Sequence, residues 1–415
     1  MTASHSLAEP ERGNSLIDSV ANSLVSQALV DTPIEEIFEK TCKQLHAAGV
    51  PIARAQIGFK ILHPLFDAQT LTWTLNQKVE RNDFIYSENR DPWRKSPMFY
   101  LIINQISHMR RKLTGDEAML DFDILETLKT EGYTDYLAFI VPFSKKTVID
   151  KNAEELENSG IVGSWSTTRK TGFSDNDILA LKRIEQRLAV AFKINIQTQI
   201  TENILSAYLG PDAGSQVLNG NIQRGDGETI YAVLWYSDMR DSTSLANSMS
   251  GKEFLQALNT YFESTAGAVL NHSGEVLRFI GDAVLAIFPI RDEGATQWAC
   301  ESAMKAALEA RTNMQEANQK RQGDNRPALS FGLGLHVGKV LFGNIGVPQR
   351  VEFSVIGRAA NEVARIESLT KELHRPTLVS AEFARNISVD WVDAGEHLLK
   401  GLDRPLQVYS PSELD

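Results

Sequence analysis

The sequence predicts an α+β protein made of two globular parts joined by one long helix. Apolar runs typical of strands alternate with amphipathic helical stretches, both before residue 173 and after residue 228. Between these parts, apolar residues recur every three or four positions from Ile178 to Tyr208, which indicates one helix of about nine turns. The chain has 415 residues, enough for two or three domains.

Composition and charge exclude several classes of protein. Hydrophobic residues make up 42% and charged residues 23% of the chain, as in ordinary globular domains. The net charge of -11 argues against a general nucleic-acid binder. No apolar run approaches the ~18 residues that would span a bilayer, and Glu9 and Glu11 interrupt the apolar core that a signal peptide would need. Cys42 and Cys300 match no metal or redox spacing, so a cytoplasmic location is expected.

The first thirty residues are polar and carry only a weak helical stripe, at Leu16, Val20, Leu24 and Ala28. A stripe of this kind can be a helix that docks on a partner. Chain termini are more often poorly ordered, so residues 1–30 are predicted to be a flexible segment.

Residues 31–173 are predicted to form the N-terminal domain. Its expected helices cover residues 34–48 and 98–112, and its expected strands cover residues 53–61, 70–75, 136–143 and 160–166. The last strand leads to Ser174, a good helix N-cap with Asp177 three residues on. This order of elements resembles a GAF-type sensor domain, mainly over residues 137–192. The resemblance implies a regulatory domain with an unidentified small-molecule ligand; a dimerisation module without a ligand is the alternative.

Two histidines of this domain, His63 and His108, stand in no ligand pattern. We interpret both as solvated or hydrogen-bonded side chains rather than cofactor ligands.

The long helix has an apolar stripe longer than most globular helices need. We expect it to pair in parallel with a second copy of the chain, the alternative being that it packs on its own domain. Gly210 and Pro211 end the helix, and residues 219–227 are polar. Residues 174–227 are therefore predicted to be a connector.

The C-terminal domain is predicted to cover residues 228–415. Strands are expected over residues 229–237, 275–280, 283–288, 329–337, 340–345 and 351–356, with a turn at residues 338–339 and helices over residues 251–270, 294–320 and from residue 359. Antiparallel hairpins of this kind predict a sheet with its helices on one face.

Two aspartates stand at the ends of apolar strands in this domain. Asp238 follows the first strand, and Asp282 lies between the second and third strands. Carboxylate oxygens suit magnesium, which takes few protein ligands and fills its shell with water and phosphate oxygens. The alternative is that each aspartate only ends a strand at a turn.

The motifs around these aspartates resemble those of class III nucleotide cyclases. Residues 236–243, YSDMRDST, resemble the first metal motif of that family, and residues 278–282, RFIGD, resemble the second. Residues 334–338 and 343–346 resemble the central hairpin. Residues 354–357 and 361–367 resemble the strand and helix that hold ribose and phosphate. The match runs in order over nearly all of residues 228–411 and implies a ferredoxin-like antiparallel sheet.

The resemblance implies conversion of ATP to cyclic AMP and pyrophosphate. Asp238, Asp282 and the backbone carbonyl of Met239 would hold two Mg²⁺ ions, for which Mn²⁺ can substitute. Asn361 would fix the ribose. Arg365 is four residues further along the same helix face and would bind the phosphorane with its planar fork. The alternative for Asn361 and Arg365 is a plain polar helix face.

The positions that would read the base depart from the family pattern. Arg278 stands where adenylate cyclases have Lys, and Ser354 stands where they have Asp or Thr. Arg278 can donate to adenine N1 but cannot accept from guanine N1–H, which favours ATP. Arg350 and Lys400 are candidate triphosphate contacts, or else solvated surface charges.

The resemblance also implies a homodimer, because in this family the metal aspartates and the Asn/Arg helix serve one site from opposite subunits. The alternatives to an adenylate cyclase are a guanylate cyclase and a catalytically silent nucleotide-binding protein.

Overall fold

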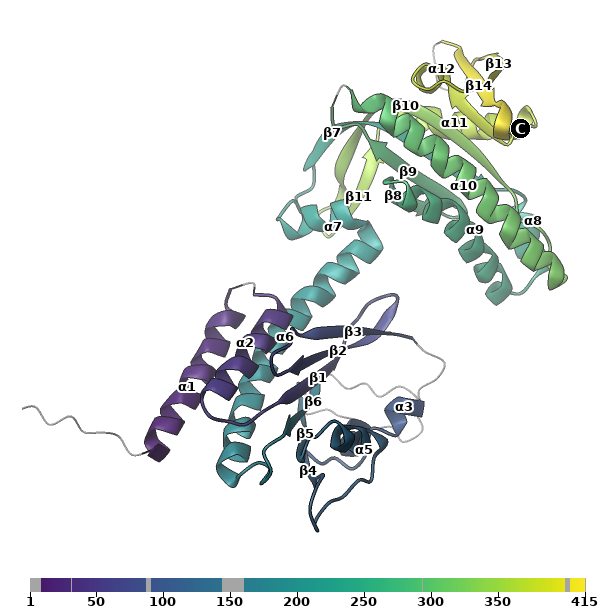
Figure 1. Cartoon of the computed structure of the whole chain (residues 1–415). Coiled ribbons are helices and arrows are strands. Elements are labelled where there is room, and N and C mark those ends of the chain that lie inside the picture. Colours follow the sequence, from purple (N-terminus) through teal and green to yellow (C-terminus); the bar gives the residue numbers. More distant parts are fainter. Residues whose placement is uncertain are drawn as a thin grey trace, which may run out of the picture. The chain divides into compact units, whose positions relative to one another are not determined.

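The computed structural model describes residues 9–30, 32–86, 91–143, 160–292, 294–399 and 404–414. It divides into two compact units, Met1–Ala207 and Tyr208–Asp415. Each unit has its own sheet and its own buried core (Figure 1). The division falls near the end of the long helix α6 (Asp175–Leu209). In the described parts of the chain, no helix combines the length and the apolar character that crossing a membrane requires.

The N-terminal unit is built on a six-stranded antiparallel sheet in the order β3-β2-β1-β6-β5-β4. Its strands are β1 (Arg54–Lys60), β2 (Phe66–Thr74), β3 (Glu80–Ile85), β4 (His108–Lys112), β5 (Asp135–Pro142) and β6 (Gly160–Thr167). The resemblance of this unit to a GAF domain stays a prediction.

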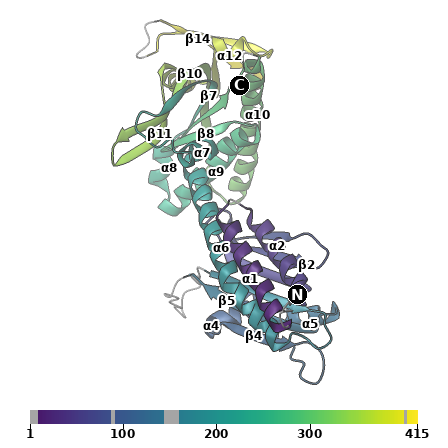
Figure 2. The ribbon, with the colours of Figure 1, turned by 90° about the vertical axis from the view of Figure 1, so that its left-hand side faces the viewer.

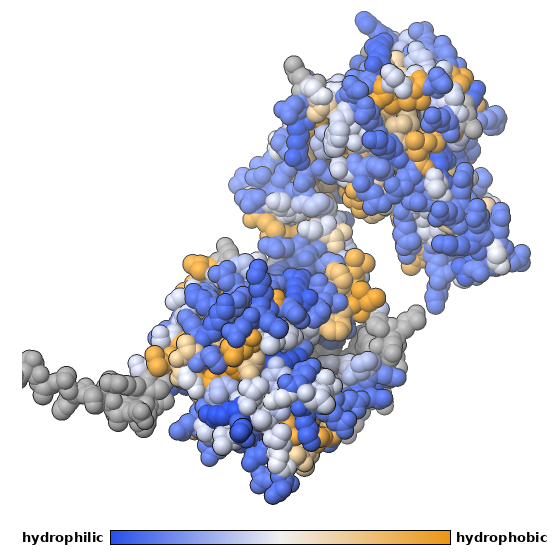
Figure 3. Space-filling view, in the orientation of Figure 1, coloured by the Kyte–Doolittle hydropathy of each residue, from blue (hydrophilic) through white to orange (hydrophobic). Residues whose placement is uncertain are grey.

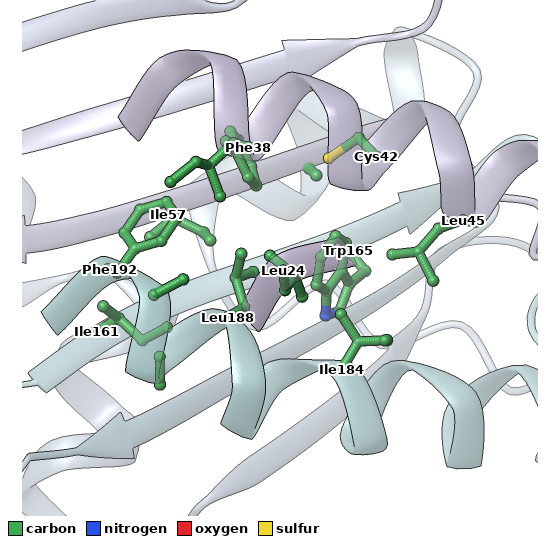
Figure 4. Close-up of a cluster of buried hydrophobic side chains, with 14 of the residues drawn as sticks. Leu24, Phe38, Cys42, Leu45, Ile57, Ile161, Trp165, Ile184, Leu188 and Phe192 are labelled. Atoms are coloured by element: carbon green, nitrogen blue, oxygen red, sulfur yellow. The ribbon is translucent and has the colours of Figure 1, made fainter. Parts of the chain in front are cut away.

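Helices cover both faces of this sheet. The larger core is shared by the sheet with α1 (Glu9–Ala28), α2 (Ile34–Ala47) and α6, and Figure 4 shows Phe38, Trp165 and Phe192 within it. A second core joins the sheet to α4 (Pro97–Ile103) and α5 (Asp123–Thr130). The short helix α3 covers Asp91–Arg94.

The prediction of a flexible N-terminal segment was wrong for residues 9–28, which form α1. Ile17, Val20 and Leu24 on this helix are buried in the larger core. Gln44 on α2 also donates to Ser23 on α1 at 3.3 Å. The weak stripe is therefore a docking face within the chain, which the sequence alone could not distinguish from a frayed end.

The prediction that α6 presents its stripe to a second chain was wrong for the first half of the helix. Leu181, Ile184, Leu188 and Phe192 are buried in the core of the N-terminal unit, so here the alternative reading holds. Among the residues of the predicted stripe, only Tyr208 at the end of the helix is exposed, at 84%.

Glu185, on the same face of α6, is buried and accepts a hydrogen bond from the Trp165 indole at 2.9 Å. Its other carboxylate oxygen lies 2.6 Å from His108 Nε2. His108 is thus a hydrogen-bonded histidine, as predicted. His63 likewise accepts a hydrogen bond, from the backbone of Leu65.

The expected helix over residues 98–112 is instead a helix followed by a strand. The helix α4 stops at Ile103, and Gln105 takes a left-handed conformation with φ of 55°. The chain then enters β4, which pairs with β5. The sequence has no glycine or proline at this point to mark the break.

The C-terminal unit is built on an eight-stranded sheet in the order β13-β14-β12-β10-β7-β9-β8, with β11 paired to the far part of β10. The strands are β7 (Gly227–Met239), β8 (Glu275–Ile280), β9 (Ala283–Pro289), β10 (Phe331–Val347), β11 (Arg350–Ile356), β12 (Thr377–Ser380), β13 (Trp391–His397) and β14 (Leu406–Pro411). All pairs are antiparallel except β10 with β12.

Helices lie on both faces of this sheet, which corrects the expectation of one covered face. Apolar residues of α9 (Gly251–Asn271) and α10 (Ala295–Gly323) share one core with the sheet, and α11 (Arg358–Glu372) shares another. The remaining helices are α7 (Pro211–Leu218), α8 (Ser242–Ser248), α12 (Ala381–Ala384) and the 3-10 turn Ser412–Leu414. Figure 3 shows that the visible face of each unit is mostly hydrophilic, with small apolar areas.

The turn predicted at Gly338 and Lys339 does not exist, because β10 runs unbroken through both residues. Gly338 serves packing instead. A Cβ atom at this position would lie 2.5 Å from the Cβ of Ala359, so the glycine lets α11 lie close to the sheet.

The short helix α7 is held against β8 by two carboxyl groups, Asp212 and Glu275. Burial, and then the hydrogen bond with Asp212 and its charge, raise the pKa of Glu275 to about 7. The hydrogen bond between Glu275 and Asp212 therefore connects β8, the strand before Asp282, to α7, the helix that follows α6.

This pair predicts a pH-dependent stability. A folded pKa above the unfolded value means that the folded protein binds more protons between pH 4.5 and 7, so the free energy of unfolding falls as the pH rises through that window. We expect Glu275→Gln to raise the Tm of the C-terminal unit by a few degrees at pH 8 and to leave it unchanged at pH 4.5. Thermal unfolding of the full chain at both pH values measures this.

Glu263→Gln, which changes an exposed glutamate on α9, is the matched control. An equal shift at both pH values would show that Glu275 is not protonated preferentially in the folded protein.

Candidate functional site

The two strand-end aspartates meet at one edge of the C-terminal sheet. Asp238, near the end of the central strand β7, pairs across to Ala283 at the start of β9. Asp282 lies in the two-residue turn between β8 and β9, where Gly281 has φ of 62°. The Met239 N–H donates to the backbone oxygen of Asp282 at 3.3 Å. Strand pairing therefore brings the two aspartates to the same edge, close enough for the charge of Asp282 to act on Asp238.

The electrostatics of this edge favour a cation. Burial, and then the charge of Asp282, raise the pKa of Asp238 to about 6, although Arg240 and Lys371 oppose the shift. A divalent ion bound between these two half-buried carboxylates would stabilise the charge on Asp238.

Magnesium fits this donor set. Within the described residues there is no group of three or more His, Cys, Asp or Glu side chains that could hold a metal. Two carboxylates and the neighbouring carbonyl of Met239 leave several positions for water and substrate oxygens, which is how Mg²⁺ is usually held.

An open cavity of about 810 Å³ lies beside Asp238. It is bounded by the loop after β7, the start of α8 and the last turns of α11. Arg240 spans one wall: its Nη1 donates to Glu367 Oε1 at 3.1 Å, and its Nη2 donates to Thr370. Burial raises the pKa of Glu367 to about 7, even though Arg240 beside it lowers that pKa.

Sequence reasoning missed the pairing of Arg240 with Glu367. The two residues are 127 positions apart, and neither stands out by type or spacing. The only local signal is Gly332 on β10. A Cβ there would collide with Arg240 Nη2 and Glu367 Oε1, so the glycine leaves the space that the pair occupies.

Asn361 and Arg365 lie together on the exposed face of α11, one turn apart. Neither lines the cavity beside Asp238, which α11 contacts only through residues 367–372. The first turn of α11 packs on β10 at Gly338. Asp238 pairs with Gly332, six residues earlier on the same strand. In the single chain, neither Asn361 nor Arg365 therefore lines the cavity that Asp238 lines.

A buried histidine fixes the turn of α11 that carries Asn361. His336 Nε2 on β10 lies 3.1 Å from Glu362 Oε2, and Arg358 Nε donates to the other oxygen at 2.8 Å. The hydrogen bond with His336 lowers the pKa of Glu362. His336 lies within residues 334–338, which the sequence marks as part of a motif, but nothing in that motif predicts the contact with Glu362.

The predicted base-reading residues lie on two strands that are not hydrogen-bonded to each other. Arg278 is on the edge strand β8, and Ser354 is on β11. Arg350 is exposed at the start of β11, at the tip of the β10–β11 hairpin. Lys400 lies outside the described residues.

Comparison with known proteins agrees with this arrangement. Residues 228–408 match the family model of the adenylate and guanylate cyclase catalytic domain. An adenylate cyclase of Anabaena cylindrica is 32% identical over 170 residues, which cover 40% of this chain and 33% of that protein. This chain thus spans about a third of the length of that relative.

Two solved structures also resemble part of the chain. The adenylyl cyclase CyaB from P. aeruginosa is 23% identical, with a TM-score of 0.41, and the match covers 45% of this chain and 95% of that one. The guanylyl cyclase Cya2 is 26% identical, with a TM-score of 0.41, and the match covers 46% of this chain and 95% of that one.

The C-terminal unit is therefore a class III nucleotide cyclase catalytic domain. The strands and the helix that carry Asp238, Asp282, Asn361 and Arg365 form where the sequence predicted them.

Proposed function

We propose that the chain is an adenylate cyclase that converts ATP to 3′,5′-cyclic AMP and pyrophosphate. The observation that carries the proposal is the pair Asp238 and Asp282, set side by side by strand pairing within a domain that matches the cyclase family. A silent nucleotide-binding protein would not need Asp238 to be half-buried next to the charge of Asp282.

Each residue has a definite task in this reaction. Asp238, Asp282 and the carbonyl of Met239 would hold two Mg²⁺ ions, which acidify the ribose 3′-hydroxyl and neutralise the triphosphate when bound. Asn361 hydrogen-bonds the ribose and orients its 3′-oxygen toward the α-phosphorus. Arg365 places its planar fork on the equatorial oxygens of the phosphorane. Arg350 and Lys400 are proposed to bind the triphosphate.

The active site is proposed to form between two copies of the chain. Asn361 and Arg365 are exposed and do not line the cavity beside Asp238 of their own chain, which supports their supply by a second copy. Apolar side chains are also exposed around the edge strand β8 and the β10–β11 hairpin, and Figure 2 shows β11 at the margin of the unit. They are Phe279, Ile280, Leu341, Ile345, Val347, Val351 and Ile356. Such a surface suits a homodimer.

Regulation by the N-terminal unit is part of the proposal, since α6 belongs to the core of that unit and leads directly into α7 and the catalytic domain. A small-molecule ligand of the N-terminal unit remains the predicted signal.

The experiment that tests the proposal is a cyclisation assay of the full chain with ATP and GTP, each with Mg²⁺ and with Mn²⁺. We expect cyclic AMP to be the main product. Preference for GTP would make the chain a guanylate cyclase, and no cyclic product from either nucleotide would identify a silent binding protein.

A further inference from the structure

Arg240 connects the loop that follows β7 to the helix α11. It comes directly after Met239, the last residue of β7, and its backbone N–H donates to the carbonyl oxygen of Ser330 at 2.8 Å. Its guanidinium donates to Glu367 and to Thr370, which lie three residues apart near the end of α11. The backbone of Arg240 is thus bonded to the segment before β10, and its side chain is bonded to the helix.

The contacts between Arg240 and α11 are largely shielded from water. The side chain of Arg240 is 19% exposed and that of Glu367 is 5% exposed, and Thr370 is buried. Pulling such a pair apart would leave a buried charge without its partner, which is strongly unfavourable. We therefore expect the loop after β7 and the end of α11 to move together.

The helix α11 takes part in two places at once. Its last turns line the cavity beside Asp238 of the same chain. Two residues before Glu367, the exposed Arg365 is proposed to act in the site that contains the partner's aspartates, and so is Asn361 one turn earlier. Because the backbone hydrogen bonds of a helix are closed within it, a displacement at Glu367 is passed along to Arg365.

We infer that Arg240 is a positioning residue that acts across the dimer, holding α11 through Glu367 and Thr370 so that Arg365 is correctly placed in the other active site. This inference rests on the shared site of the proposed function. Arg240 lines the cavity of one site and sets the geometry of a group that works in the second. A shift of the loop in one site would therefore reach the catalytic arginine of the other.

A role limited to its own metal loop is the alternative for Arg240. Burial and then the charge of Asp282 raise the pKa of Asp238, and the charge of Arg240 opposes that shift. In this alternative, Arg240 would serve the aspartates of its own chain. The two roles affect different sites of one dimer, so a dimer with a single intact site can separate them.

The test uses mixed dimers of two full-length chains with different tags. A chain with Asp238→Ala supplies Arg365 to the one intact site, and a chain with Arg365→Ala supplies Asp238 to it. The other site receives both defects. Purification on both tags isolates the mixed dimers, and Arg240→Gln is then introduced into either chain in turn.

Arg240→Gln should lower kcat most when it lies in the chain that supplies Arg365, although that chain contributes no aspartate to the intact site. We expect a loss of about 10-fold or more, because a misplacement of about 1 Å caused far from the chemistry can cost about 10²-fold. In the chain that supplies Asp238, the same change should cause the smaller loss, since α11 of that chain serves only the damaged site.

Two further variants of the chain that supplies Arg365 show whether the contact itself is responsible. Glu367→Ala should cause the same loss as Arg240→Gln, and the double variant should lose little more, because residues that act as one unit are not additive. Arg240→Lys keeps the charge and can still donate to Glu367, so it should retain part of the activity.

Arg385→Gln, which changes an exposed arginine at the end of α12, is the control and should leave kcat unchanged in either chain. A loss that is equal for the two chains would indicate a general effect on folding or assembly and would overturn the inference. So would a larger loss in the chain that supplies Asp238. If the starting mixed dimer forms no cyclic product, the shared site of the proposed function has failed, and the inference fails with it.

Discussion

Asp282→Ala should abolish cyclisation while leaving the protein folded. The side chain sits half-buried in a two-residue turn, and β8 and β9 stay paired on both sides of it. Its loss removes a proposed metal ligand. Metal stabilisation of transition-state charge amounts to several kcal/mol, which corresponds to a loss of about 10³-fold or more in kcat.

The same change should leave the metal-free protein at least as stable as the wild type. The charge of Asp282 contributes to the raised pKa of Asp238, so removing it relieves a repulsion. Product formation followed by chromatography, and thermal unfolding without metal, measure the two effects. Stability that holds while activity disappears is the mark of a functional carboxylate.

A suitable control is Asp241→Asn, which changes the aspartate three residues after Asp238, in the loop that follows β7. Asp241 lines the cavity and has φ of 55°, a conformation that Asn adopts equally well. Most of the activity should remain in this variant. Normal turnover in a folded Asp282→Ala protein would exclude the two-metal proposal.

Mixing two inactive variants, Asp238→Ala and Arg365→Ala, should restore activity. In a mixed dimer one shared site receives both defects, and the other receives an intact Asp238 from one chain and an intact Arg365 from its partner. Random exchange makes about half of all dimers mixed, each with one intact site of two, so about a quarter of the wild-type rate is expected.

The control mixes Asp238→Ala with Asp282→Ala, whose defects fall in the same half-site. Every mixed dimer then lacks an intact aspartate pair, and no activity should return. Exchange must be confirmed with a differently tagged copy of each variant. Confirmed exchange without recovery in the first mixture would mean that each chain carries a complete site.

Local patterns in the sequence predicted the strands and helices that carry the candidate site. The apolar run before Asp238 and the Gly281–Asp282 turn are short-range signals, and both elements form as predicted. Asn361 and Arg365 share a helix face because their spacing requires it. Local motifs of this kind therefore predict where along the chain the strands, turns and helices of the site lie.

Contacts between distant segments could not be predicted in the same way. The pairs Arg240–Glu367 and Arg278–Glu352 join residues more than seventy positions apart, and each member alone looks like a surface charge. Burial of α1 likewise depends on a surface that α2 provides. Gly338 illustrates the reverse error, since a glycine required by helix packing has the same appearance in a sequence as one required by a turn.

The burial of α6 determines where the chain can be divided. Its first five turns carry Leu181, Ile184, Leu188 and Phe192, which complete the core of the N-terminal unit. A fragment starting at residue 175 would expose this stripe to water and promote aggregation, while the N-terminal fragment would lose part of its interior. A cut near residue 207 leaves each core whole. For expression of separate fragments, the long helix belongs to the N-terminal unit.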